Sequence, residues 1–198
     1  MTTGHRIALA LLVLGCLVSA PARTQGKSAL ALEQLMKDLA QVKSARGRFV
    51  ERKHLAMLNA PLESSGTLVY VAPGRLEKHM LSPRRESLIL DGDQLIIENK
   101  DKGQRRTFPL QEHPVLWAFV ESVRSTLTGD LATLQRFYEV RLEGDAGAWR
   151  LRLKPKEPRM RQAASEIRVG GSGTWVSVIE IDEAGGDRSV TTITREAG

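Results

Sequence analysis

The chain has 198 residues, a formal net charge of +6 and one cysteine. That length suits one domain, or a small domain with tails. Its basic residues are interleaved with acidic ones, as in Arg84-Arg85-Glu86, which is typical of a solvated surface. We find no nucleic-acid-binding motif, so nucleic acid is not an expected partner; contact with anionic membrane surfaces is the functional alternative reading of the charge.

Residues 1–22 have the pattern of a secretory signal peptide. His5 and Arg6 form a short basic region, residues 7–18 are apolar, and Ala20-Pro21-Ala22 is a small-x-small cleavage site. We therefore expect cleavage after Ala22, export across the membrane, and a single domain over residues 23–198.

The segment Val13-Leu14-Gly15-Cys16 leaves an alternative open. It loosely resembles a bacterial lipobox, which would leave Cys16 lipidated and the protein anchored in a membrane. If Cys16 is instead removed with the signal peptide, the mature chain has no cysteine and cannot use disulfides, so its apolar core must suffice for stability.

The first part of the mature chain predicts one helix followed by strands. Residues 28–44 are predicted to form an amphipathic helix, because apolar residues recur there at spacings of three and four: Leu32, Leu35, Met36, Leu39 and Val42. Residues 48–55 are predicted to form a strand. Residues 65–83 predict a hairpin, with a turn at Pro73-Gly74 and an end near Pro83.

The middle of the chain predicts a second hairpin and then two helices. Residues 88–90 and 95–97 flank Asp91-Gly92-Asp93, a strong turn signal, and residues 104–110 predict another short strand. Helical spacing begins at Pro114 and continues to residue 127. After Gly129, Asp130 is predicted to cap a short helix that ends near Phe137.

The last third returns to a period of two. Residues 138–142 and 149–154 alternate apolar with charged side chains, and residues 166–169, 175–182 and 188–194 predict three further strands. The whole chain then has about eleven strands with segregated helices, which indicates an antiparallel α+β or barrel-like domain rather than a parallel sheet.

No constellation predicts catalysis or metal binding. His54, His79 and His113 are not spaced as ligand pairs, and no Gly-x-Ser-x-Gly elbow is present. Gly170–Gly173 joins two strands and does not open a helix, so it does not predict a phosphate site. We expect no cofactor and no enzymatic activity.

The apolar side chains are more informative than the polar ones. One face of a curved sheet should be buried beneath the helices. The side chains on that face either pack into an ordinary dry core or line a cavity for an apolar ligand. The residues that we predict to line such a lipid-binding cavity are Phe49, Leu68, Tyr70, Leu76, Met80, Leu88, Leu90, Leu95, Leu116, Trp117, Phe119, Trp149, Leu151 and Leu153.

The order of these elements resembles the bacterial periplasmic lipoprotein carriers of the LolA-like family. The likeness covers nearly the whole mature chain and rests on order and spacing: an N-terminal helix, Phe49, Ser65-Gly66-Thr67-Leu68, Pro73, Ser82-Pro83, Asp91-Gly92, a mid-chain helical insertion and Trp149-x-Leu151-x-Leu153-x-Pro155. The resemblance implies an unclosed antiparallel half-barrel with helices as a lid. Its apolar cavity would take the acyl chains of outer-membrane lipoproteins.

The resemblance also implies partners, and the sequence differs from the family pattern at two positions. An inner-membrane release complex would supply the cargo and an outer-membrane acceptor would receive it, with the carrier a monomer. Such carriers typically have Arg where Ala72 stands and an aromatic residue where Lys78 stands, so the cargo of this branch is an acylated lipoprotein or another amphiphile such as a glycolipid. The remaining alternatives are a membrane-anchored acceptor lipidated at Cys16, a binding or sensory module with a dry core, and, most distantly, a periplasmic enzyme.

Overall fold

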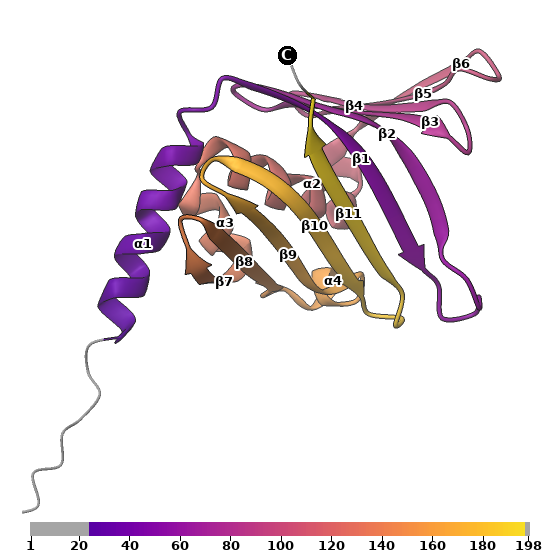
Figure 1. Cartoon of the computed structure of the whole chain (residues 1–198). Coiled ribbons are helices and arrows are strands. Elements are labelled where there is room, and N and C mark those ends of the chain that lie inside the picture. The colour runs from indigo at the N-terminus through magenta and orange to yellow at the C-terminus, as the bar shows by residue number, and fades with distance from the viewer. Residues whose placement is uncertain (1–23, 197–198) are drawn as a thin grey trace, which may run out of the picture.

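A single bent sheet forms the body of the protein (Figure 1). The computed structural model describes residues 24–196; the expected signal peptide and Cys16 lie outside them. Eleven antiparallel strands run in the order β6-β5-β4-β3-β2-β1-β11-β10-β9-β8-β7, and β6 and β7 are not paired with each other, so the sheet stays open. The strands are β1 (Ser44–His54), β2 (Leu62–Val71), β3 (Arg75–Ser82), β4 (Glu86–Asp91), β5 (Gln94–Asn99), β6 (Gln104–Pro109), β7 (Tyr138–Asp145), β8 (Ala148–Pro155), β9 (Ala164–Ser172), β10 (Trp175–Glu183) and β11 (Arg188–Arg195).

The helices gather on the concave side of this sheet. They are α1 (Thr24–Leu39), the 3-10 turn η1 (Leu110–Glu112), α2 (Pro114–Thr128), α3 (Leu131–Phe137) and α4 (Pro158–Arg161). Figure 1 shows α2 and α3 behind β7–β11, between the two halves of the bent sheet, and α1 at the β7 end. The predicted α+β half-barrel with helices over its concave face is therefore confirmed.

Helix ends follow their local sequence. Proline, which lacks the amide donor that a first turn leaves unused, is the first residue of α2. Gly129 ends α2 in the left-handed conformation with φ 71°, and the Asp130 carboxylate accepts the Thr133 N–H at 2.9 Å to begin α3.

At the junction of α1 and β1, two boundaries differ from the sequence prediction. The first helix ends at Leu39 and not at Ser44, and β1 begins at Ser44 and not at Arg48. Pairing explains both, because Ser44 and Ala45 lie opposite Val71 and Tyr70 of β2, and these ladder bonds replace the last helical turn. The four-residue helix α4 was not predicted, since one turn is too short to show a period.

The packed core lies toward the β7–β9 end. Its buried members come from α1, α3, α4 and the inward faces of β1 and β7–β11: Leu32, Leu35, Met36, Leu39, Phe49, Leu134, Tyr138, Trp149, Leu151, Leu153, Met160, Ile167, Val169, Val176 and Ile193. A smaller cluster of Leu90, Leu95 and Leu110 lies under the β4–β5 hairpin. No helix within residues 24–196 is long and apolar enough to cross a membrane.

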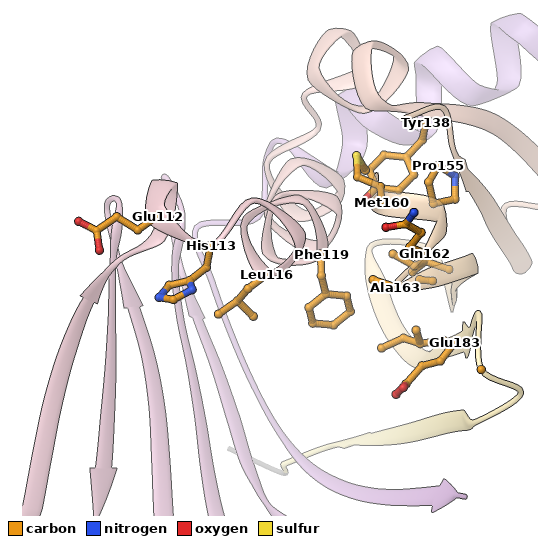
Figure 2. A pocket seen from close by; sticks show the side chains of 14 residues that line it. Glu112, His113, Leu116, Phe119, Tyr138, Pro155, Met160, Gln162, Ala163 and Glu183 are labelled. Carbon is orange, nitrogen blue, oxygen red and sulfur yellow. The ribbon is translucent and has the colours of Figure 1, made fainter. Parts of the chain in front are cut away.

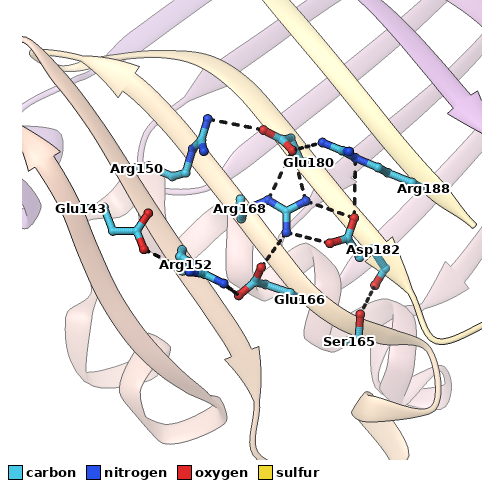
Figure 3. Close-up of polar contacts among 9 residues, drawn as sticks. All are labelled: Glu143, Arg150, Arg152, Ser165, Glu166, Arg168, Glu180, Asp182 and Arg188. Atoms are coloured by element: carbon cyan, nitrogen blue, oxygen red, sulfur yellow. Dashed lines mark hydrogen bonds and ion pairs between the residues drawn. The ribbon is translucent and has the colours of Figure 1, made fainter. Parts of the chain in front are cut away.

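The outer face of β7–β11 carries an ion-pair network (Figure 3). Arg168 is at its centre and contacts the carboxylates of Glu166, Glu180 and Asp182 at 2.6, 3.1 and 2.7 Å. Burial alone would raise the pKa of Glu166 and of Glu180, but hydrogen bonds and positive charge from the surrounding arginines outweigh it and lower both values. These carboxylates are therefore ionised at neutral pH.

Candidate functional site: an apolar cavity beneath α2

A cavity of about 590 Å³ lies between the concave face of the sheet and α2. That volume is within the roughly 300–1,000 Å³ typical of small-molecule sites. The sheet contributes Leu68, Tyr70, Leu76, Leu88, Leu90, Leu95, Ile97, Ile179 and Ile193 to its wall, and α2 contributes Leu116, Phe119, Val120, Val123 and Leu127. The wall contributed by α2 is apolar because residues spaced by three and four share one helix face.

A second space adjoins the first beside the start of α2 (Figure 2). It has a volume of about 730 Å³ and lies between α2, α4 and the β10–β11 turn. Figure 2 shows Leu116 and Phe119 extending from α2 into this space, with Ala163 and Glu183 across from Phe119. Leu116, Phe119, Ile181 and Glu183 line both spaces, so these side chains form the boundary between them.

Polar contacts hold α2 on the sheet. The Arg124 guanidinium donates to the Gly92 carbonyl at 3.1 Å, approaches Asp93 at 3.9 Å, and also pairs with Glu121. The same side chain lies against Gly74, where an added Cβ would be 2.9 Å from the Arg124 Cδ. The side chain of Arg124 therefore connects α2 to the β2–β3 and β4–β5 turns.

Aromatic packing fixes the other side of α2. The Trp117 ring meets the Phe137 ring of α3 edge-to-face, with centroids 4.8 Å apart.

Burial raises the pKa of Tyr138, at the start of β7, so its hydroxyl stays protonated at neutral pH.

The wall of the cavity carries two charged pairs, Glu51–Lys78 and Lys53–Glu183. Lys78 Nζ on β3 is 2.7 Å from Glu51 Oε2 on β1, and it lies 4.9 Å from the centre of the Phe49 ring. Glu51 also accepts a hydrogen bond from the Ser64 hydroxyl at 3.1 Å. Lys53, two residues further along β1, pairs with Glu183 at 2.7 Å.

The structure places the predicted lining residues in two groups. Those on the wall of the 590 Å³ cavity are Leu68, Tyr70, Leu76, Leu88, Leu90, Leu95, Leu116 and Phe119. The others belong to the packed core or lie against it: Phe49, Met80, Trp117, Trp149, Leu151 and Leu153. The structure brings all of them to the concave side, but only the first group faces the cavity.

Several wall residues were not predicted from the sequence. Val123 and Leu127 continue the helical spacing of Leu116 and Phe119, so the period already indicated them. Glu51 and Lys53 share a strand face with Phe49, and this alternation was the available signal for a polar stretch of wall.

The histidines do not assemble into a reactive site. His79 Nδ1 contacts the Ser87 hydroxyl at 2.9 Å and Nε2 contacts the Glu77 carboxylate at 2.7 Å, both on neighbouring positions of β3 and β4. Within residues 24–196, no three His, Cys, Asp or Glu side chains come together as a metal site would require.

The fold is thus an open antiparallel half-barrel in which an amphipathic helix covers a cavity with a largely apolar wall. The family model described as "Outer membrane lipoprotein carrier protein LolA-like" matches residues 24–197 of the sequence. The chain therefore belongs to the LolA-like family.

Two curated relatives are both called outer-membrane lipoprotein carrier protein. The protein from Ralstonia nicotianae is 39% identical over 93 residues, which are 44% of this chain and 43% of that protein. The protein from Cupriavidus taiwanensis is 37% identical over 79 residues, which are 38% of this chain and 37% of that protein. The chain thus matches less than half the length of each relative.

Solved structures also match the chain, at low sequence identity. A LolA superfamily protein from Nitrosomonas europaea aligns with a TM-score of 0.45 and 10% identity, over 85% of this chain and 95% of that one. A chain from the complex structure of Pseudomonas aeruginosa MucA/MucB aligns with a TM-score of 0.47 and 15% identity, over 83% of this chain and 56% of that one.

Proposed function

We propose that the protein is a periplasmic carrier that shields the acyl chains of an outer-membrane lipoprotein or a similar amphiphile during transfer toward the outer membrane. In this proposal residues 1–22 are removed on export and residues 23–198 form the carrier domain. An inner-membrane release complex supplies the cargo, an outer-membrane acceptor receives it, and the carrier acts as a monomer without enzymatic activity. The observation that carries the proposal is the 590 Å³ cavity walled by apolar side chains.

The energetics of acyl chains explain why a carrier without chemistry is useful. Burying one methylene group is worth roughly 0.8 kcal/mol, so a chain of about fourteen such groups resists entering water by on the order of 10 kcal/mol. A protein that replaces water with an apolar wall removes most of this barrier. Membership of the LolA-like family supports the same role.

In this proposal α2 acts as the lid, and entry of the acyl chain displaces it. Leu116 and Phe119 form the boundary between the two spaces, so they are the side chains that an entering chain must move. A ligand that binds the displaced arrangement more tightly shifts the protein toward it.

The first test identifies what the native protein carries. Protein purified from periplasm is examined by native mass spectrometry, and the apo protein is titrated with a fluorescent fatty acid. We expect a bound amphiphile and saturable binding. A native protein without amphiphile, together with a linear titration, contradicts the proposal.

A matched pair of variants tests whether the cavity is the site. Val123→Trp places an indole in the cavity from α2, whereas Val50→Trp places one on the outer face of β1, where Val50 is 36% exposed. We expect the first variant to lose fatty-acid binding and the second to keep it, with both still folded. Equal binding by both variants would place the site elsewhere.

A further inference from the structure

The Glu51–Lys78 pair lies at one end of a graded cavity. By strand register, Tyr70, Leu76, Leu90 and Leu95 form one apolar row across β2–β5. Glu51 instead lies opposite Ser64 of β2 and Thr191 of β11, in a polar row nearer the far end of β1. The wall therefore changes from apolar to polar along the strands, which is the profile of a site for an amphiphile held in one orientation.

Glu51 has almost no hydrogen-bonding capacity left. A carboxylate offers about four acceptor positions. Lys78 Nζ donates at 2.7 Å and the Ser64 hydroxyl at 3.1 Å, while the hydroxyls of Ser189 and Thr191 lie 3.4 and 3.3 Å away. Burial alone would raise the pKa of Glu51, but the charge and hydrogen bond of Lys78 and the hydroxyl contacts outweigh it and lower the value. The carboxylate is thus ionised and already satisfied by the protein.

Lys78 differs from Glu51 in this respect. An ammonium group has three donors, and within residues 24–196 Lys78 has a hydrogen bond to Glu51 alone, with its remaining contact to the Phe49 ring. Its side chain keeps 24% of its surface exposed and is part of the cavity wall. The spare hydrogen-bonding capacity at this end of the cavity is therefore that of a donor.

Glu51 offsets the charge of Lys78, but the ammonium group still has donors that no described residue uses, beside an apolar wall. Its cross-strand neighbours are Leu68 and Leu88, so an acyl chain bound along the wall passes beside the ammonium. The polar atom that an acyl chain carries at its head is a carbonyl oxygen, which accepts hydrogen bonds and donates none. This chemistry complements Lys78 and does not compete for Glu51.

We propose that Lys78, held by Glu51, is the head-group subsite of the cavity and selects amphiphiles whose acyl chain ends in a carbonyl oxygen, as a carboxylate or as an ester or amide. This inference rests on the proposed carrier function and specifies its ligand class. The apolar row accommodates the chain, and the ammonium of Lys78, which reaches Glu51 of the polar row, accommodates the carbonyl.

The test compares three ligands that differ at the head alone. Decanoate, methyl decanoate and decane are each used to displace the neutral probe N-phenyl-1-naphthylamine from the wild-type protein, from Lys78→Met and from Glu51→Gln/Lys78→Met. The double variant leaves no unpaired buried carboxylate, so it keeps the test valid if the single variant unfolds. Lys154→Met on β8 is the control, since Lys154 is exposed on the outer face.

We expect both Lys78 variants to bind decanoate and methyl decanoate about tenfold more weakly than the wild type, a change of about 1.4 kcal/mol, with decane unchanged. A loss for decanoate alone assigns the subsite to a free carboxylate, and a loss for both assigns it to an acyl carbonyl in general. Equal effects on all three ligands, or none, would overturn the inference. A wild-type protein that binds neither probe nor ligand would instead overturn the carrier function itself.

Discussion

Two leucines on the same sheet should respond very differently to truncation, because one lies in the packed core and the other faces the cavity. Leu151 on β8 is 0% exposed within the core. Its replacement by alanine leaves an enclosed void and should cost about 2–5 kcal/mol of the free energy of unfolding. Leu88 on β4 is half-buried and borders existing space. Its truncation encloses no new void, so we expect a cost of about 1 kcal/mol.

Urea unfolding followed by circular dichroism measures both costs under identical conditions. The expected difference of about 1–4 kcal/mol corresponds to a gap in Tm of roughly 2–4 °C for each kcal/mol in a domain of this size. Both are Leu→Ala changes within strands, so changes in β-propensity largely cancel. If Leu88→Ala costs as much as Leu151→Ala, side chains fill the space beneath α2 in solution, and the reasoning that leads to a carrier fails.

Three further predictions concern the frame around the cavity. Gly129→Ala should lower the free energy of unfolding by more than the roughly 1–2 kcal/mol that a left-handed alanine costs, since its Cβ would lie 2.1 Å from the Met36 carbonyl oxygen. Gly92→Ala, whose Cβ would have nothing within 4 Å, should cost only that left-handed strain in the same unfolding assay. Arg124→Ala should release bound probe about tenfold faster in stopped-flow, and an unchanged rate would show that this residue does not hold α2 closed. The pKa values of Glu166 and Glu180 are lower in the folded protein than in the unfolded chain, where a glutamate has a pKa of about 4.3. The two carboxylates therefore stabilise the fold fully above that pH, and this contribution is lost as the pH falls further. Tm measured from pH 7 to 3 should decline mainly below pH 4, and a decline already complete at pH 5 would contradict this.

Local turn chemistry explains why so much of the fold was predictable. Asp91-Gly92-Asp93 and Pro73-Gly74 fix where strands must reverse, and both hairpins lie where these residues indicate. The end of α1 was not predictable in the same way. Residues after Leu39 keep a helical spacing of apolar side chains, but pairing of Ser44 with β2 outweighs that preference.

The candidate site was only half predictable, for a physical reason. Alternation along a strand tells which side chains point inward, and it does so equally for Leu68 and for Leu151. Whether an inward side chain meets a neighbour or a cavity depends on what lies above it. The helices α1 and α3 contact β7 and complete the core around Leu151, whereas Leu68 faces the cavity beneath α2.

The same argument explains why the Glu51–Lys78 pair was not predicted from the sequence. A lysine between Glu77 and His79 is expected at the surface, because burying a charge is costly. The register of β3 with β2 and β4 nevertheless places Lys78 beside Leu68 and Leu88, on the concave face. The sheet tolerates this because Glu51, on a strand separated from β3 by β2, supplies the compensating charge. A polar contact of this kind depends on residues far apart in sequence, so it becomes visible when the strands are paired and not before.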